Sequence, residues 1–373
     1  MRIDIIGGGP AGNYTAYLLA KKGHSINLYE KDSEIGKPVQ CTGILSDYFL
    51  TLMSPKKEFI DNVVEKTRIY SPNGHFIEAK IKKNYVICRK KFDSYLAELA
   101  KEQGAKYHLN QSFKGFEKKD EKIISRINNS GKELFSEADI LVGADGPLSP
   151  VAKSADLYGE RNFVIGTQVE AKMRNDNAVE FYPYIGCYAW IVPKNKNVVR
   201  IGVASYKNSP ELFKNFAKAK LGKDYEKRFL EHQSGVIPVF NPRVKAQAKN
   251  IYLIGDAATF VKATSGGGIN QSLKAATILA ECIDKGKNYD KEWKKSMFRN
   301  LHAHLIIHKM MLKFKEEDWD SLIDTFSQEK MKKILYSESR DKIVKMLTRI
   351  ALTKPSLFKY VKYFPFEEVR NIF

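Results

Sequence analysis

Cysteine is scarce in this sequence of 373 residues: Cys41, Cys88, Cys187 and Cys282 are far apart and form no C-x-x-C pair. This spacing argues against a structural zinc site and against a thioredoxin-type redox centre. The number is also too low for a disulfide scaffold, which fits a reducing cytoplasm. The chain has no apolar run long enough to span a membrane, and its first residues lack the features of a signal peptide. We therefore expect a cytoplasmic protein without a membrane-spanning helix.

Acidic residues are the other deficit. The chain has 43 Asp and Glu against 62 Lys and Arg, which gives a formal net charge of +19. Such a surplus favours nucleic acid, anionic lipid or phosphorylated ligands as partners, but a general bias of the composition explains it equally well. No nucleic-acid-binding motif accompanies the charge, so we expect no nucleic-acid partner. With 43% hydrophobic residues, the chain is long enough for two domains and a small appendage.

The first thirty residues contain the strongest local pattern. Residues 2–6 form a short apolar segment, residues 11–22 have apolar side chains at helical spacing, and residues 25–29 form a second apolar segment. Between the first two stands Gly7-Gly8-Gly9-Pro10-Ala11-Gly12, which matches G-x-G-x-x-G. A strand, a glycine-rich turn, a helix and a second strand in this order predict a dinucleotide-binding fold.

Each position of this pattern has a physical role. Gly7 allows a tight turn out of the strand, Gly9 lets the backbone approach a pyrophosphate, and Gly12 lets the helix pack against the strand. The start of the helix offers free N–H groups to the phosphates. Glu30 ends the second strand, 18 residues after Gly12, where a carboxylate can bind ribose hydroxyls. An acid at this position favours FAD or NAD over NADP.

Two later segments also consist of an apolar strand that ends in glycine and aspartate. The first is residues 138–146, which end in Gly143-Ala144-Asp145-Gly146. The second is residues 250–258, and it precedes the glycine run 266–268 and a helix that we predict over residues 271–283. Backbone N–H groups at such a helix start can bind an anionic group, such as the edge of a reduced flavin ring. Asp256 is placed to bind ribityl hydroxyls.

In this order and spacing, the three segments resemble the FAD-dependent oxidoreductases of the p-hydroxybenzoate hydroxylase fold, over roughly residues 1–290. That family places an arginine before a helix, close to the flavin and the pyrophosphate, and Arg89 and Asp93 match this feature. The resemblance implies FAD as the cofactor. The residues that it implies for FAD binding are Gly7, Gly9, Pro10, Ala11, Gly12, Glu30, Lys31, Cys41, Thr42, Arg89, Asp145, Gly146, Gly255, Asp256, Gly266, Gly267, Gly268 and Ile269.

Two further segments resemble the geranylgeranyl reductases within this family. Residues 36–44, Gly-Lys-Pro-Val-Gln-Cys-Thr-Gly-Ile, are similar to their cysteine-containing loop. Residues 188–193, Tyr-Ala-Trp-Ile-Val-Pro, are similar to their Tyr-x-Trp-x-Phe-Pro motif in the substrate cavity. The chain departs from the family at Val192, where phenylalanine is usual, and at Thr264, where many members have proline.

This second resemblance implies Cys41, Tyr188 and Trp190 as catalytic residues. Each also has a structural alternative. Cys41 is either a proton donor or gate beside the reacting alkene, or a small buried apolar side chain. Tyr188 and Trp190 alternate with Ala189 and Ile191, so they share one face of a strand. They either line a lipid cavity or pack in the core.

We expect an α/β fold in three parts. A discontinuous Rossmann-type FAD-binding domain, similar to that of p-hydroxybenzoate hydroxylase, takes residues 1–60, 86–156 and 246–290. A substrate domain with an antiparallel sheet takes residues 61–85 and 157–245. Its strands are predicted at 66–71 and 75–81, around the turn Pro72-Asn73-Gly74, and at 163–172, 178–184, 187–193 and 197–206. Residues 291–373 form a helical C-terminal region.

This C-terminal region has an unusual composition. From Lys330 onward it has 11 Lys and Arg but only 4 Asp and Glu, interleaved with aromatic residues. Such a segment either lies on an anionic membrane or forms a solvated helical cap over the substrate cavity. His302, His304 and His308 stand near its start, but the glutamate of HExxH and an obvious third ligand are absent, so we expect no metal site.

The resemblance implies a reductase of lipid biosynthesis, which passes hydride from reduced flavin to the double bonds of a geranylgeranyl lipid or prenyl diphosphate. Two alternatives stay open: a flavin-dependent monooxygenase or halogenase of the same fold, and an electron-transfer flavoprotein linked to ferredoxin. The single G-x-G-x-x-G argues against a separate NAD(P)H site, so the reductant, NAD(P)H or ferredoxin, is open. Peripheral contact with the inner face of an anionic membrane is open as well.

Overall fold

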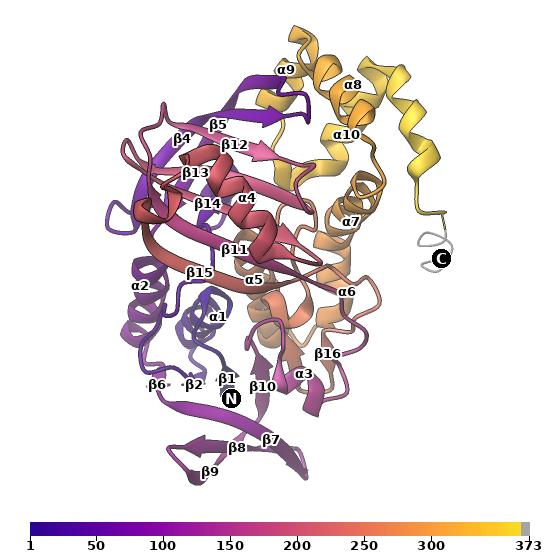
Figure 1. Ribbon diagram of the computed structural model, residues 1–373. Coiled ribbons are helices and arrows are strands. Elements are labelled where there is room, and N and C mark those ends of the chain that lie inside the picture. The colour runs from indigo at the N-terminus through magenta and orange to yellow at the C-terminus, as the bar shows by residue number, and fades with distance from the viewer. Residues whose placement is uncertain (367–373) are drawn as a thin grey trace.

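The computed structural model describes residues 1–366 and contains three β-sheets beside a group of C-terminal helices (Figure 1). One sheet has six strands in the order β16-β17-β10-β1-β2-β6. Its strands are β1 Arg2–Ile6, β2 Ser25–Tyr29, β6 Lys106–His108, β10 Ile140–Gly143, β16 Gln247–Ala248 and β17 Ile251–Leu253. The central strands run parallel, and only the edge strand β16 pairs with β17 in the antiparallel direction.

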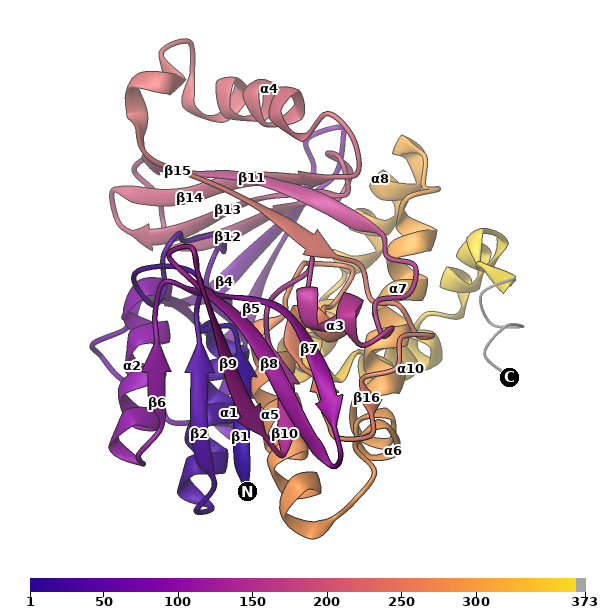
Figure 2. The ribbon, with the colours of Figure 1, turned by 90° about the horizontal axis from the view of Figure 1, so that it is seen from below.

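Both faces of this six-stranded sheet are covered, which explains why its strands are apolar on both sides. Helices α1 (Pro10–Lys21), α2 (Arg89–Glu102) and α5 (Ile269–Lys285) pack side by side on one face (Figures 1 and 2). The other face carries a three-stranded sheet, which is formed by β7 Gln111–Lys119, β8 Lys122–Asn129 and β9 Lys132–Ala138. A short helix, α3 (Pro150–Ser154), follows β10.

The largest sheet has eight strands in the order β15-β11-β14-β13-β12-β4-β5-β3. Its strands are β3 Ile44–Leu45, β4 Ile60–Tyr70, β5 Phe76–Ile87, β11 Phe163–Lys172, β12 Ala178–Tyr182, β13 Tyr188–Asn195, β14 Val198–Ser205 and β15 Phe229–Pro238. The predicted antiparallel arrangement holds except between β12 and β4, which pair in parallel. These two strands come from distant parts of the chain, so no hairpin fixes their relative direction.

Helix α4 (Ser209–Leu221) covers the outer face of the eight-stranded sheet, as Figure 2 shows. Phe213 and Phe216 of α4 pack there on Val169 and Ile201. The opposite face, which bears Tyr188, meets the glycine run before α5, because a Cβ added to Gly266 would lie 2.5 Å from the Tyr188 hydroxyl. The eight-stranded sheet therefore meets the glycine run where the sequence predicts the flavin.

The C-terminal helices lie along one side of the molecule (Figure 1). They are α6 Tyr289–Trp293, α7 Arg299–Met311, α8 Glu316–Phe326, α9 Glu329–Ser337 and α10 Ile343–Thr353. Shorter helical turns are η1 Asp47–Thr51, η2 Tyr225–Arg228, η3 Gly255–Ala258, η4 Lys294–Phe298, η5 Arg340–Lys342 and η6 Pro355–Tyr363. Helices α8 and α9 pack on β5, and α10 packs on α7. The end of the predicted helical region, residues 367–373, lies outside the described residues.

The observed elements extend beyond several predicted bounds. The helix predicted over 271–283 is α5, and the hairpin predicted from two short runs consists of the long strands β4 and β5. Two register shifts interrupt their pairing, between Ile60 and Asn62 and between Val64 and Lys66, and such bulges break the regular alternation on which the prediction depends. In residues 1–366, no helix combines the length and the apolar character that crossing a membrane requires.

Candidate functional site

Two glycines in the turn between β1 and α1, Gly7 and Gly12, pack so closely that they admit no side chain. A Cβ at Gly12 would lie 1.9 Å from the carbonyl oxygen of Gly7, and one at Gly7, whose φ is +107°, would lie 2.4 Å from that of Ala144. Gly9 differs, because a Cβ there would meet nothing within 4 Å. The space in front of Gly9 is therefore open to a ligand, whereas Gly7 and Gly12 are needed for the close packing of β1, β10 and α1.

The start of α1 presents backbone donors to this open space. Gly9 precedes Pro10 and Ala11 without a side-chain cap, and no acidic residue lies in the first turn. The helix dipole and its free N–H groups can therefore receive a phosphate. Glu30 braces the turn by accepting hydrogen bonds from the backbone N–H groups of Gly8 at 2.6 Å and Asp32 at 3.0 Å. The adjacent Lys31 is exposed.

Asp256 lies between the amino-terminal ends of α1 and α5. Gly255, with φ of +62°, packs so closely that an added Cβ would lie 3.0 Å from the Cβ of Ala11 and 2.9 Å from Oγ of Ser272. Burial raises the pKa of Asp256 to about 6, and the positive charge of Arg89 opposes this shift. A carboxylate in this position can accept hydrogen bonds from ribityl hydroxyls.

The glycine run before α5 forms a cradle, and side chains from three different segments lie close to its backbone. A Cβ would lie 2.5 Å from the hydroxyl of Tyr188 if added to Gly266, 2.8 Å from Cε of Lys262 if added to Gly267, and 3.0 Å from Oδ1 of Asp256 if added to Gly268. Ile269 then begins α5. The Tyr188 hydroxyl is buried, yet it has no hydrogen-bond partner among the described residues. A buried orphaned hydroxyl is costly, so it marks a place where a ligand can bind.

The loop that contains Cys41 is tied to the eight-stranded sheet by Arg200. This buried guanidinium donates to the carbonyl oxygens of Thr42 at 2.7 Å and Ile87 at 2.8 Å. Its charge is balanced by Glu170 at 3.0 Å and Asp61 at 2.8 Å. The loop is thereby fixed to the eight-stranded sheet.

Cys41 itself is half-buried and faces the start of α2. Its Sγ accepts a hydrogen bond from the backbone N–H of Gly43 at 3.3 Å. Arg89, at the start of α2, forms a 2.8 Å ion pair with Asp93. Burial opposes the charge of Arg89, but Asp93 and then Cys41 outweigh it, so the pKa of Arg89 is raised. The structure thus brings Cys41, Arg89 and Asp93 together.

Trp190 and Thr42 share one hydrogen-bond acceptor. The indole N–H of Trp190 donates to Oε1 of Gln168 at 2.9 Å, and the hydroxyl of Thr42 donates to the same oxygen at 2.6 Å. The ring of Trp190 packs on Gly202, where a Cβ would lie 2.4 Å from the indole, and it lies 5.8 Å from the ring of Tyr188. Trp190 therefore packs beside Tyr188 and is linked to the Cys41 loop through Gln168.

Asp145 has a local partner set. It accepts hydrogen bonds from the hydroxyl of Ser149 at 2.5 Å and from the backbone N–H of Val151 at 2.9 Å, at the start of α3. Burial nevertheless raises its pKa to about 6. Gly146 follows with φ of +78°, which favours glycine. This pair shapes the turn after β10, which packs against Gly7.

Three buried groups in this site escape the sequence motifs. Lys262 hydrogen-bonds to Gly267 through its backbone and forms a 2.8 Å ion pair with Asp341 of the C-terminal region. Burial opposes the charge of Asp341, but Lys262 outweighs it and lowers the pKa of Asp341 to about 2. His304 contacts the hydroxyl of Thr264 at 2.7 Å and the carbonyl oxygen of Arg340 at 3.1 Å. The C-terminal region is therefore fastened to the glycine run.

His304 and His308 both have structural partners. His308 contacts the hydroxyl of Tyr206 at 2.9 Å. No group of three His, Cys, Asp or Glu side chains in residues 1–366 is arranged to hold a metal ion.

Together these features fit FAD. The open turn at Gly9 and the free helix start suit a pyrophosphate, Glu30 and Asp256 suit the hydroxyls of its two sugar chains, and the glycine cradle suits the ring. The orphaned hydroxyl of Tyr188 points into that cradle.

Comparison with known proteins agrees with this geometry. Residues 1–285 match the family of FAD binding domains. The chain is 30% identical to a digeranylgeranylglycerophospholipid reductase of Methanocaldococcus jannaschii, over 96% of this chain and 97% of that protein. This chain belongs to the geranylgeranyl reductase family of FAD-dependent oxidoreductases. A protein of the same name from Methanosarcina acetivorans is also 30% identical, over 87% of this chain and 88% of its own length. The predicted enzyme class and cofactor, FAD, are thereby confirmed.

Solved structures confirm the predicted fold of this geranylgeranyl reductase family member. A geranylgeranyl bacteriochlorophyll reductase-like protein from Thermoplasma acidophilum superposes with a TM-score of 0.84, covering 97% of this chain and 98% of that one, at 23% sequence identity. A flavin-dependent brominase superposes less well, with a TM-score of 0.71 at 17% identity, over 97% of this chain and all of that one. At these identities both comparisons concern the fold alone.

Proposed function

We propose that this enzyme reduces the double bonds of geranylgeranyl chains, carried by a glycerophospholipid or a prenyl diphosphate. One observation carries the proposal: similarity to proteins named digeranylgeranylglycerophospholipid reductase extends over 96% of the chain, beyond the FAD-binding match at residues 1–285. The C-terminal region, which contacts the glycine run through Lys262 and Asp341, is therefore part of the resemblance.

The proposed chemistry divides between cofactor and chain. FAD, when bound, supplies the hydride. The alkene is unactivated, so the chain must hold it close to the ring and keep water out. Tyr188 and Trp190 would form an apolar wall for this purpose, and Cys41 would hold the proton that adds to the other carbon. The backbone N–H groups of residues 266–268 would stabilise negative charge at the edge of the ring.

An anaerobic conversion tests the reaction. The purified FAD-loaded protein is reduced chemically, geranylgeranyl lipids are added, and the lipid mass and flavin absorbance are recorded. We expect the lipid to gain mass in steps of two hydrogens while the flavin is reoxidised. Unchanged lipid with reduced flavin would contradict the proposal. Admission of air, followed by oxygen consumption coupled to a new product, would then favour the monooxygenase or halogenase alternative.

The role of Cys41 has a separate test. We expect Cys41→Ala to bind FAD as the native chain does but to lose about 100-fold in the rate of flavin reoxidation by lipid, which is typical of a lost proton donor. Cys88→Ala, a second half-buried cysteine without a proposed role, is the control. Full turnover in Cys41→Ala would remove Cys41 from the mechanism and leave the reductase proposal intact.

We also propose that the C-terminal region docks on an anionic membrane at its cytoplasmic face. Leu352 is 79% exposed and Phe358 is 61% exposed, and Lys354 and Lys359 lie within two positions of them in the sequence. Exposed apolar side chains among lysines are typical of interfacial segments. Co-sedimentation with liposomes should increase with the content of anionic lipid. Binding that ignores this content would contradict the proposal.

A further inference from the structure

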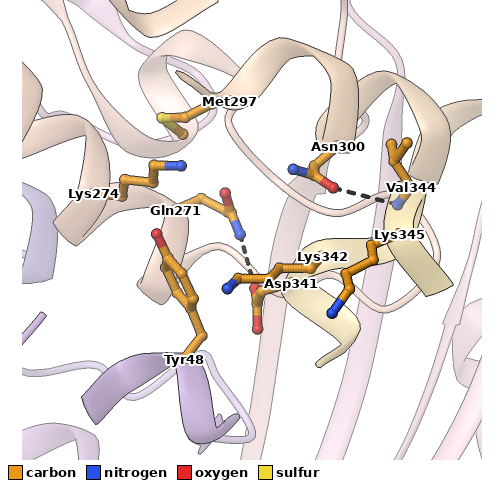
Figure 3. A pocket seen from close by; sticks show the side chains of 9 residues that line it. All are labelled: Tyr48, Gln271, Lys274, Met297, Asn300, Asp341, Lys342, Val344 and Lys345. Carbon is orange, nitrogen blue, oxygen red and sulfur yellow. Dashed lines mark hydrogen bonds between the residues drawn. The ribbon is translucent and has the colours of Figure 1, made fainter. Parts of the chain in front are cut away.

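A cavity of about 430 Å³ lies between α5, α7, the start of α10 and the turn η1. It falls within the usual size range of small-molecule sites. Figure 3 shows Lys274 of α5, Lys342 at the end of η5 and Lys345 at the beginning of α10, with Tyr48 of η1 and Asn300 of α7 around them. A smaller neighbouring cavity of about 130 Å³ shares Tyr48, Lys342 and Lys345.

The cavity is strongly positive. Asp341 is the one carboxylate among its lining residues, and it is already paired with Lys262 at 2.8 Å. Lys345 forms an ion pair with Glu338 at 3.2 Å, and the same carboxylate also forms an ion pair with Arg349 at 2.5 Å. Three lysines therefore line a space whose single lining carboxylate, Asp341, is already paired with Lys262.

Two of these lysines form no ion pair within the described part of the chain. Lys342 is exposed and forms no ion pair or side-chain hydrogen bond with residues 1–366. Lys274 is half-buried and donates only to the carbonyl oxygen of Ser296, at 2.9 Å. Burial lowers the pKa of Lys274, Asp341 opposes this shift, and the repulsion from the charge of Lys342 lowers the pKa by a smaller amount. An anion between them would remove this repulsion.

The cavity lies beside the contact between the C-terminal region and the glycine run. Its inner wall is Gln271, in the first turn of α5, whose amide donates to Asp341 at 2.9 Å and so adjoins the contact between Lys262 and the glycine run. Its outer edge includes Val344, which is 40% exposed on the face of α10 that also presents Leu347. The cavity therefore extends from the residues that adjoin the glycine run to the exposed start of α10.

We infer that Lys274, Lys342 and Lys345 form a binding site for a phosphate group, which receives the phosphate of the substrate lipid headgroup. The assignment of this phosphate to the substrate rests on the proposed reductase function. The assignment of a phosphate site rests on the cavity and its charge alone. Tyr48 and Asn300 add a hydroxyl and an amide that can donate to phosphate oxygens.

The test measures binding to the oxidised FAD-loaded protein, so no turnover is needed. Calorimetric titrations use inorganic phosphate, glycerol phosphate and a soluble short-chain phosphatidylglycerol, with the corresponding diacylglycerol as a probe without phosphate. We expect the phosphate-bearing probes to bind and the diacylglycerol to bind at least about tenfold more weakly than the phospholipid. Binding should weaken as salt is added.

Matched variants locate the site. Lys342→Gln removes an exposed charge without changing the core, and we expect it to weaken binding of glycerol phosphate about tenfold. Lys118→Gln is the control, because Lys118 is equally exposed but belongs to β7 at the other end of the molecule (Figure 1). Both variants should unfold at the temperature of the native protein.

Each outcome decides a separate point. Binding of all three phosphate compounds supports a general phosphate site, and binding of the phospholipid alone supports a headgroup site. Absence of binding by every phosphate compound, or equal binding to the native protein and Lys342→Gln, overturns the inference. A protein that binds phosphate at this site but fails the anaerobic conversion would refute the reductase function and leave the phosphate site standing.

Discussion

Two walls of the proposed flavin site are built in different ways. The wall made by β1, α1 and β2 is local in sequence and consists of backbone: Gly7, Gly12 and Glu30 lie within the first thirty residues. The wall made by Lys262 and Asp341 joins residues 79 positions apart through buried charges. The first depends on close steric fit and the second on charge neutralisation, so substitutions and pH should affect them differently.

Gly12→Val should break the local wall and have the largest effect. The first added carbon already lies 1.9 Å from the Gly7 carbonyl oxygen, and backbone cannot move away as a side chain can. We expect a loss of at least about 3 kcal/mol in the free energy of unfolding and no bound FAD. Urea unfolding and flavin absorbance per protein measure these effects. A Gly12→Val protein with native stability and FAD content would contradict this account.

Asp341→Asn should detach the distant wall. It leaves Lys262 as a buried charge without its carboxylate, which typically costs about 3–5 kcal/mol. We expect faster hydrogen exchange in the C-terminal helices, because Asp341 also accepts from Gln271 of α5. Asp224→Asn is the control, since the Asp224–Lys227 pair is exposed and such pairs contribute little.

A double variant distinguishes charge from packing. Replacing the pair by Lys262→Met and Asp341→Leu removes both charges, so most of the stability lost in Asp341→Asn should return. If Asp341→Asn alone unfolds like the native protein, the two walls do not differ in the way proposed.

The two walls also explain how much the sequence could predict. The G-x-G-x-x-G turn, the strand ends at Asp145 and Asp256, and the helix after the glycine run follow from local patterns, because a backbone cradle needs particular residues at short spacing. The α/β class and FAD follow from the same patterns, and the family comparison confirms both.

The residues that sequence patterns did not predict contact partners that are far away along the chain. Arg200 binds the carbonyl of Thr42, 158 positions away, and Asp341 binds Ser46, 295 positions away. A single buried arginine in an apolar strand has no short-range pattern that separates it from a surface charge. The contact of His304 with Thr264, 40 positions away, likewise has no local pattern that could predict it.

Acidification should lower the free energy of unfolding through the distant wall, and by less than Asp341→Asn does. Burial and then Lys262 lower the pKa of His304 to about 3, while Asp341 opposes the shift. The unfolded state therefore takes up the proton near pH 6.5 and the folded state does not, so stability is present above that pH and is lost as the pH falls towards 3. For one such group the expected loss between pH 7 and pH 5 is about 2 kcal/mol.

His304→Gln isolates this contribution. The amide can still contact Thr264 and the Arg340 carbonyl, but it does not titrate. The free energy of unfolding of the native protein minus that of the variant should fall by about 2 kcal/mol between pH 7 and pH 5. A difference that is constant over this range would show that His304 is not held neutral by its surroundings.

Gly9→Ala should have the smallest effect and sharpens the comparison within the local wall. Gly9 has φ of −79° and its Cβ position is open, so alanine fits the backbone and should leave the stability of the FAD-free protein unchanged or slightly raised. The added methyl group would instead occupy the space proposed for the pyrophosphate. We expect FAD to bind about tenfold more weakly, measured by quenching of flavin fluorescence. Gly12→Val and Gly9→Ala would then separate the two uses of glycine in one motif, because the first removes the fold and the second only the fit to the cofactor. Unchanged FAD affinity in Gly9→Ala would place the pyrophosphate elsewhere along the start of α1.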